Sequence, residues 1–140
     1  PNYTRISDWA PVLALPNVTF INLQSSDFAV DLAAIHNEFG VTVHNFDDLD
    51  HYDNLDDVAA LSAALDIVVS VATAAATITA GVGTLTKLAT WRQSSWNNIL
   101  YSPPGPLVDI FERNTWEPWD IVFRSIAESI VDFKTMKESN

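Results

Sequence analysis

Residues 66–83 read DIVVSVATAAATITAGVG, and this stretch decides the fold class. Its first part, DIVVSV (66–71), is a short apolar run rich in β-branched residues, which is typical of a strand buried on both faces at the centre of a parallel sheet. The part from Thr73 onward contains almost only Ala, Thr and Gly apart from single Ile and Val residues, and it predicts a helix that packs closely against that sheet. A strand followed at once by a helix is the unit from which parallel sheets are built.

The alternation of strand and helix continues on both sides of this stretch. Hydrophobic patterns predict further strands at 18–23, 41–46, 84–90 and 107–113. Apolar residues at helical spacing predict helices that start near Ser26 or Asp27, after Asn54, and near Pro118, where Asn114 and Glu117 have the spacing of a capping box. The sequence therefore predicts one α/β domain over residues 1–140, a Rossmann-like three-layer α/β/α sandwich with a mainly parallel sheet.

The charge balance limits the kinds of partner. The formal net charge is −11, with only seven Lys and Arg residues, so nucleic acid and anionic membrane surfaces are not expected as partners. Because cations are few, a polyanionic ligand would have to be held mainly by backbone N–H groups and helix termini. The chain has no cysteine, which excludes disulfides, thiolate zinc sites and cysteine nucleophiles.

Targeting signals are not evident. The apolar run 67–82 is interrupted by Ser and Thr and is too short to span a bilayer, and the first residues show no signal peptide. We therefore expect a cytoplasmic protein without a membrane span. The chain starts with Pro1 rather than Met, which is compatible with a fragment of a longer protein.

Candidate ligand-binding residues follow the predicted strands, because ligands of parallel sheets sit beyond the carboxyl ends of the strands. Gln24 and Ser25 follow the first strand and would donate to a phosphate or a ribose, although a loop and helix cap is the simpler interpretation. Asp47 follows the second strand in an acidic loop, which either is simply a solvated surface or lets Asp47 accept from a ribose hydroxyl. Ser70 is the next-to-last residue of the strand at 66–71, close to the small-residue corner.

Several stretches, taken in order, resemble a known family. The likeness is to the carboxy-terminal half of GT-B glycosyltransferases of the heptosyltransferase type, and most of all to the glycosyltransferase-like domain that follows tetratricopeptide repeats in bacterial proteins. The stretches that carry it are Trp9, FINLQ (20–24), FDDLD (46–50), DDVAALSAALDIVVSV (56–71), ATAAATITAGVG (72–83), WRQSSW (91–96) and SPPGPLVDIFERNTWEPWD (102–120).

The resemblance implies a ligand and a place for it. In this family the helix after the third strand receives the diphosphate of a nucleotide-sugar donor, which here implies a cradle of Thr73, Ala74 and Ala75. Helix N-termini favour anions because their first N–H groups are unpaired and the helix dipole is positive there. The resemblance also implies that an acceptor half is needed for catalysis, so this chain alone should not transfer sugar.

Two positions depart from the family pattern and keep a second interpretation open. Ala72 and Thr77 stand where the family has Asp and His. The chain is then either a divergent donor-binding half or a non-catalytic interaction module that has kept the scaffold. Likewise, the small residues after Ala72 either receive a phosphate or simply allow close packing. If an acceptor half is missing, we expect an exposed apolar face and homodimerisation through it.

Aromatic and acidic residues complete the list of candidates. Trp96, in the Pro-rich segment 91–106 together with Trp91 and Tyr101, would stack on a base or pack, whereas Trp9, Trp116 and Trp119 are expected in or over the core. The acidic loop after residue 46 lacks the Gly and the closing Glu of a calcium loop, and the three His residues share no short spacing, so neither a metal nor a resident cofactor is predicted. A nucleophile elbow, a dinucleotide fingerprint and a P-loop are absent from the sequence.

Overall fold

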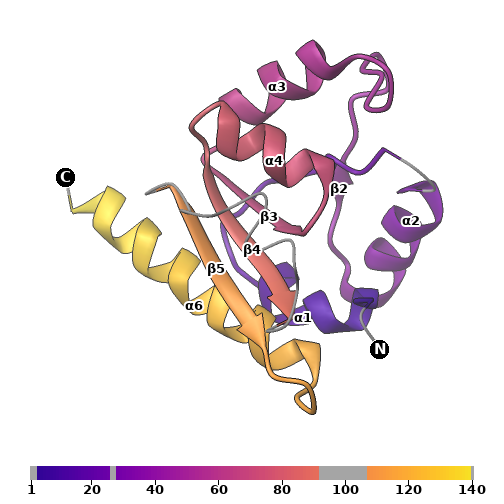
Figure 1. Ribbon diagram of the computed structural model, residues 1–140. Helices are drawn as coiled ribbons and strands as arrows, with labels where there is room; N and C mark the ends of the chain where they lie inside the picture. The colour runs from indigo at the N-terminus through magenta and orange to yellow at the C-terminus, as the bar shows by residue number, and fades with distance from the viewer. Residues whose placement is uncertain (1–2, 26–27, 92–106, 140) are drawn as a thin grey trace.

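The computed structural model describes residues 3–25, 28–91 and 107–139 (Figure 1). The elements follow one another as a 3₁₀ helix η1 (Ile6–Trp9), α1 (Ala10–Leu13), β1 (Phe20–Ile21), α2 (Phe28–Phe39), β2 (Val43–His44), α3 (Leu55–Ala64), β3 (Ile67–Val71), α4 (Ala74–Gly81), β4 (Leu85–Trp91), β5 (Val108–Arg113) and α6 (Trp119–Glu138). From β1 onward this order matches the predicted one. The short helices η1 and α1 were not predicted.

All strand pairs in the described residues are parallel, in a two-stranded sheet β1-β2 and a three-stranded sheet β3-β4-β5. The predicted strands at 18–23 and 41–46 shorten to two residues each. Beyond Ile21 the Asn22 side chain hydrogen-bonds to neighbouring loops, so the regular ladder stops there. The expectation that β3 is a central strand is wrong, because β4 is central and β3 lies at the edge of its sheet.

Helices cover both faces of the three-stranded sheet. In Figure 1, α4 and α3 lie on one side and the long C-terminal α6, with α1 and η1, on the other. The core on the α6 side consists of Val12, Ala89, Trp119, Val122, Phe123, Ile126, Ala127 and Ile130. Phe20 of β1 packs against the same cluster as Ile67, Val69 and Val71 of β3, so the two sheets share this core. The predicted Rossmann-like α/β/α sandwich is confirmed.

The small residues of α4 explain its close fit to the sheet. Ala76 and Thr79 are fully buried, and the Thr79 hydroxyl lies 3.2 Å from that of Thr86 on β4. The Thr84 hydroxyl donates to the Ser62 carbonyl at 2.7 Å and so ties α3 to the start of β4. Larger side chains on this face would force the layers apart. The small side chains in the second half of the stretch at 72–83 therefore allow α4 to pack closely against the sheet.

The helix ends follow local chemistry. The Asn54 side chain accepts from the Asp57 N–H and starts α3 as predicted. The helix α2 ends at Phe39, directly before Gly40, whose φ of +66° suits glycine. The start of α6 differs from prediction. Asn114 and Glu117 hydrogen-bond to each other, but they close the turn before the helix, and Pro118 holds the N-cap position. None of the helices in the described part of the chain is long and apolar enough to cross a membrane.

Candidate functional site

The corner between β3 and α4 carries two hydroxyl groups in contact. The Ser70 hydroxyl donates to the Val71 carbonyl at 2.7 Å and lies 3.2 Å from the Thr73 hydroxyl oxygen. The Thr73 oxygen in turn accepts from the Ala76 N–H at 3.4 Å and caps α4. Both predicted hydroxyls are thus brought together, and Thr73 already acts within the protein as a helix cap.

The first turn of α4 leaves backbone donors at this corner. The N–H groups of Ala76 and Thr77 bond to the Thr73 side chain and carbonyl. No described residue accepts from the N–H groups of Ala74 and Ala75, and the first turn contains no acidic side chain. Ala74 is exposed and Ala75 half-buried, so these N–H groups lie near the surface at the positive end of the helix.

A second group of predicted residues lies at the ends of β1 and β2. Gln24 donates from its side chain to Asp31 at 3.1 Å, and Asp47 accepts from Asn45 at 2.7 Å. The residue that joins these loops is the buried Asn22, which donates to the Asn45 side chain at 3.0 Å. Ser25 is exposed. Sequence reasoning missed Asn22, although an Asn directly after an apolar strand is a recognisable signal for such a loop.

Of the three aromatic residues expected to stack on a base or to pack, the structure describes only Trp91. Trp96 and Tyr101 lie outside the described residues. Trp91 ends β4 and packs against the core cluster on the α6 side. Its packing interpretation is therefore the one the structure supports.

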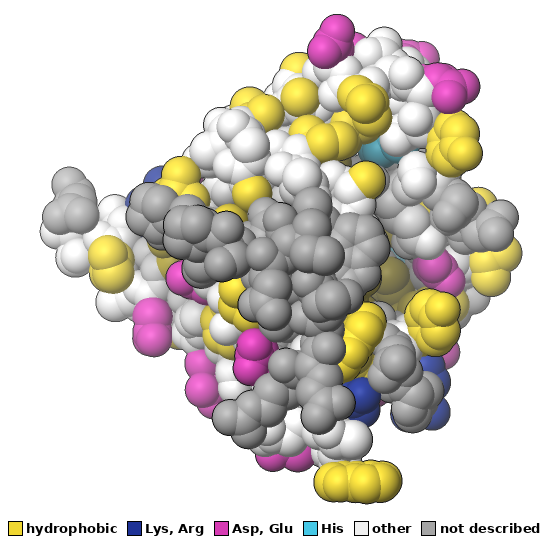
Figure 2. Space-filling model, viewed as in Figure 1, with side chains coloured by type: hydrophobic (Ala, Val, Ile, Leu, Met, Phe, Trp, Pro, Cys, Tyr) yellow, Lys and Arg dark blue, Asp and Glu magenta, His cyan; other side chains and the backbone are white. Residues whose placement is uncertain are grey.

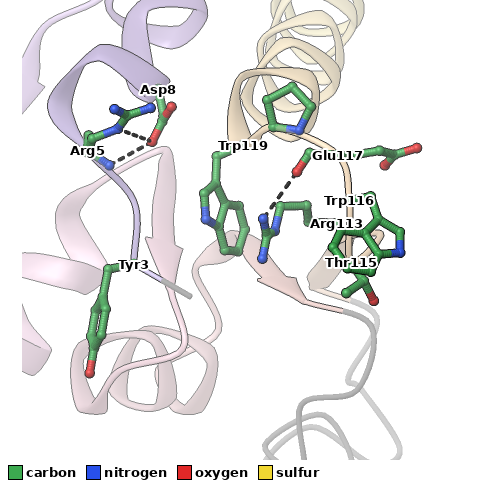
Figure 3. A pocket seen from close by; sticks show the side chains of 9 residues that line it. Tyr3, Arg5, Asp8, Arg113, Thr115, Trp116, Glu117 and Trp119 are labelled. Atoms are coloured by element: carbon green, nitrogen blue, oxygen red, sulfur yellow. Dashed lines mark hydrogen bonds and ion pairs between the residues drawn. The ribbon is translucent and has the colours of Figure 1, made fainter. Parts of the chain in front are cut away.

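An open cavity of about 460 Å³ lies at the carboxyl end of β5, next to the start of α6. Figure 3 shows its two sides: the N-terminal segment on one, and the turn from β5 to α6 on the other. The residues that line it are Tyr3, Arg5, Asp8, Arg113, Thr115, Trp116, Glu117, Pro118 and Trp119.

Arg113 is the central polar side chain of this cavity. It is only 7% exposed, and its guanidinium lies over the Trp119 ring, 4.6 Å from the ring centroid. Its Nη1 donates to the Glu117 carbonyl at 3.1 Å, whereas its Nε has no hydrogen-bond partner among the described residues. It makes no ion pair within the described residues.

The opposite wall carries a buried acid and an exposed cation. The Asp8 carboxylate accepts from the Arg5 N–H at 2.7 Å and lies 4.0 Å from the Arg5 Nε. Tyr3 and Trp116 are both strongly exposed. The expectation that Trp116 belongs to the core is wrong, because the turn before α6 directs its indole to solvent, where it is 95% exposed.

Sequence reasoning also missed Arg113 as a candidate site residue. The available signal was its place as the last residue of a strand, two positions after Phe111, which puts both on the face that α6 covers.

The acidic loop shows how Asp residues shape a turn. Hydrogen bonds from the backbone N–H groups of Asp53 and Tyr52 hold the pKa of Asp50 below its ordinary value. No group of three or more His, Asp or Glu side chains able to hold a metal ion occurs in residues 3–25, 28–91 and 107–139.

Comparison with known proteins gives one informative similarity. The protein FlbA of Caulobacter vibrioides (strain ATCC 19089 / CIP 103742 / CB 15) is 35% identical to this chain over 127 residues, which cover 89% of the chain and 21% of FlbA. The chain thus spans about a fifth of the length of this relative. No family model matches the chain, and no solved structure matches it. The name FlbA states neither a ligand nor a reaction.

Proposed function

We propose that this chain binds the diphosphate of a nucleotide-sugar at the start of α4, as the donor half of a divergent GT-B-like glycosyltransferase. The observation that carries the proposal is the pair of N–H groups on Ala74 and Ala75, which no described residue accepts from. They lie at the carboxyl end of β3, where parallel sheets bind their ligands. The likeness of the sequence to the heptosyltransferase type supports the same place.

Electrostatics favour backbone donors over side-chain cations here. The net charge of −11 repels a diphosphate at long range, and only seven residues of the chain are Lys or Arg. A helix N-terminus with exposed N–H groups attracts an anion without a basic side chain. The exposed methyl group of Ala74 leaves room for a phosphate to reach the backbone.

The remaining candidates would contact the nucleoside. In this proposal Gln24 and Ser25 donate to the ribose or a phosphate, Asp47 accepts from a ribose hydroxyl, and Trp96 stacks on the base. Gln24 and Asp47 would have to exchange their present bonds to Asp31 and Asn45 for bonds to the ligand. Since both bonds are exposed, that exchange costs little.

Sugar transfer would need a further domain. The chain spans about a fifth of FlbA, so the proposal includes a bacterial, cytoplasmic and longer protein in which another part, such as an acceptor half beside tetratricopeptide repeats, completes the enzyme. No resident cofactor is proposed, because the nucleotide-sugar is the substrate.

Calorimetry with UDP, GDP, ADP and their sugar conjugates tests donor binding. Thr73→Glu places a carboxylate beside the N–H groups of Ala74 and Ala75 and is expected to abolish binding, because it competes with and repels the diphosphate. Thr135→Glu makes the same change at an exposed position of α6 and should leave binding unchanged. Equal binding by both variants, or no binding of any nucleotide at millimolar concentration, contradicts the proposal.

A non-catalytic interaction module is the second candidate. The Thr73 hydroxyl already caps its own helix, and large apolar side chains are exposed on and near α2 and α3: Val30, Phe46, Tyr52 and Leu55. Figure 2 shows hydrophobic side chains among acidic ones over the region of α3. Sedimentation over a wide concentration range tests self-association. A monomer at every concentration counts against a homodimer formed through these side chains.

A further inference from the structure

We propose that the cavity beside Arg113 is a second ligand site, which binds an organic oxyanion, a carboxylate or a phosphate ester, with an aromatic or flat apolar portion. The guanidinium of Arg113 would hold the anion, and the aromatic side chains around it would hold the apolar portion. This inference does not rest on the proposed donor site.

The charge of Arg113 lacks a partner within the described residues. The guanidinium is buried, and a buried charge without a counterion is costly. The two acids that line the cavity are engaged elsewhere: Asp8 with Arg5, and the Glu117 carboxylate with the Asn114 N–H. An anion from outside would supply the missing counterion.

The free edge of the guanidinium fits such an anion. Its Nη1 is directed to the Glu117 carbonyl, and no described residue accepts from Nε or Nη2. Nε and Nη2 together form the fork that binds both oxygens of a carboxylate or phosphate. Stacking on Trp119 fixes the plane of that fork, so the donors are held in place before a ligand arrives.

The aromatic side chains in the cavity walls indicate that the ligand carries an apolar portion beside its anionic group. Tyr3 and Trp116 line the cavity and are 85% and 95% exposed, which is unusual for aromatic side chains without a contact to make. The Trp119 ring lies against the guanidinium and beside it in Figure 3. The volume of about 460 Å³ is that of a small-molecule site.

This cavity is separate from the start of α4. It lies at the end of β5, two strands from β3 in the sheet order, which corresponds to about 10 Å across the ladder. The two sites share no residue. Failure of ligand binding at the start of α4 therefore does not decide whether the cavity beside Arg113 binds an anion, and the reverse also holds.

The experiment is a titration of the whole chain, labelled with ¹⁵N, with three probes that share one ring: phenyl phosphate, phenylacetate and benzyl alcohol. We expect at least one anion to shift the Arg113 Nε–H signal and the Trp119 indole signal, while the neutral alcohol does not. Shifts with phosphate alone identify a phosphate ester, shifts with carboxylate alone a carboxylate, and shifts with both a general oxyanion site. No shift at these groups up to about 20 mM, or equal binding of the alcohol, overturns the proposal.

Two variants with the same change of side chain test the role of the cation. Arg113→Met keeps the length and the packing over Trp119 and should weaken anion binding about tenfold or more. Arg124→Met removes an exposed cation of α6 that does not line the cavity, so binding should stay within about twofold of the parent. Equal weakening in both variants overturns the proposal. If Arg113→Met does not fold, the shifts of the Arg113 Nε–H and Trp119 indole signals in the unmodified chain decide whether the proposal stands.

Discussion

The indole of Trp9 lies 4.4 Å from the ring of Phe123, measured between centroids, with an angle of 32° between the planes. This contact joins the N-terminal helix η1 to the C-terminal helix α6, across almost the whole length of the chain. Phe123 is fully buried, and Trp9 packs against the same core cluster. The two ends of the chain therefore stabilise one another.

This contact predicts coupling between two substitutions. Trp9→Leu and Phe123→Leu should each lower the free energy of unfolding by about 1–2 kcal/mol. Because the ring contact is lost in either variant, the double variant should lose less than the sum by about 0.5–1.5 kcal/mol. Urea unfolding of the four proteins measures this difference, and strict additivity would contradict the predicted coupling.

The cap of α3 predicts a second stability effect. The Asn54 side-chain oxygen accepts from the Asp57 N–H at 3.2 Å. Asn54→Ala leaves that donor without its cap and should cost about 1 kcal/mol of unfolding free energy, whereas Asn54→Ser should cost little. Thermal unfolding compares the two variants with the parent. Equal stability of the Ala and Ser variants would show that the cap contributes nothing.

Hydrophobic pattern alone predicted most of the fold from residue 18 onward. The apolar stripe of the last helix has a period that a strand does not satisfy, whereas the run at 66–71 is identified as a strand by its short length and its β-branched residues. The order of the strands within the sheet was harder to predict from this pattern. The apolar pattern of β3 led to a central position, yet β3 lies at the edge of its sheet and is buried by the core that β1 shares with it.

The site was harder to predict than the fold, because side-chain direction decides it. Trp116 is apolar in sequence but belongs to a turn that directs it to solvent. In the sequence Arg113 is an ordinary polar residue at the end of a strand. The cavity forms only because Trp119 packs against its guanidinium and the N-terminal segment lies opposite. Residues more than 100 positions apart that line one cavity, such as Asp8 and Arg113, leave no local pattern in the sequence.

Asp50 predicts a pH effect. Its pKa is lowered by the N–H groups of Asp53 and Tyr52, so its charged form favours the folded state. The stabilisation is fully present above the ordinary aspartate pKa and is lost as the pH falls through the lower, folded-state pKa. Asp50→Asn keeps the acceptor oxygen without the titration, so its stability relative to the parent should rise as the pH falls.

Carbon-detected NMR of the Asp50 carboxyl group gives the direct check. The midpoint of its titration should lie below that of an aspartate in an unstructured peptide. A midpoint at or above that reference would show that the two backbone hydrogen bonds do not form in solution.

Thr73 allows its structural role to be separated from its proposed part in ligand binding. Thr73→Ala removes the acceptor for the Ala76 N–H and should cost about 1 kcal/mol of unfolding free energy, whereas Thr73→Ser keeps the cap. If the N–H groups of Ala74 and Ala75 hold the diphosphate, the Ala variant should still bind nucleotide, within about fivefold of the parent, because it loses a single neutral hydroxyl. Chemical unfolding and calorimetry on the same samples measure both quantities. Complete loss of binding in a folded Ala variant would assign recognition to the hydroxyl rather than to the backbone.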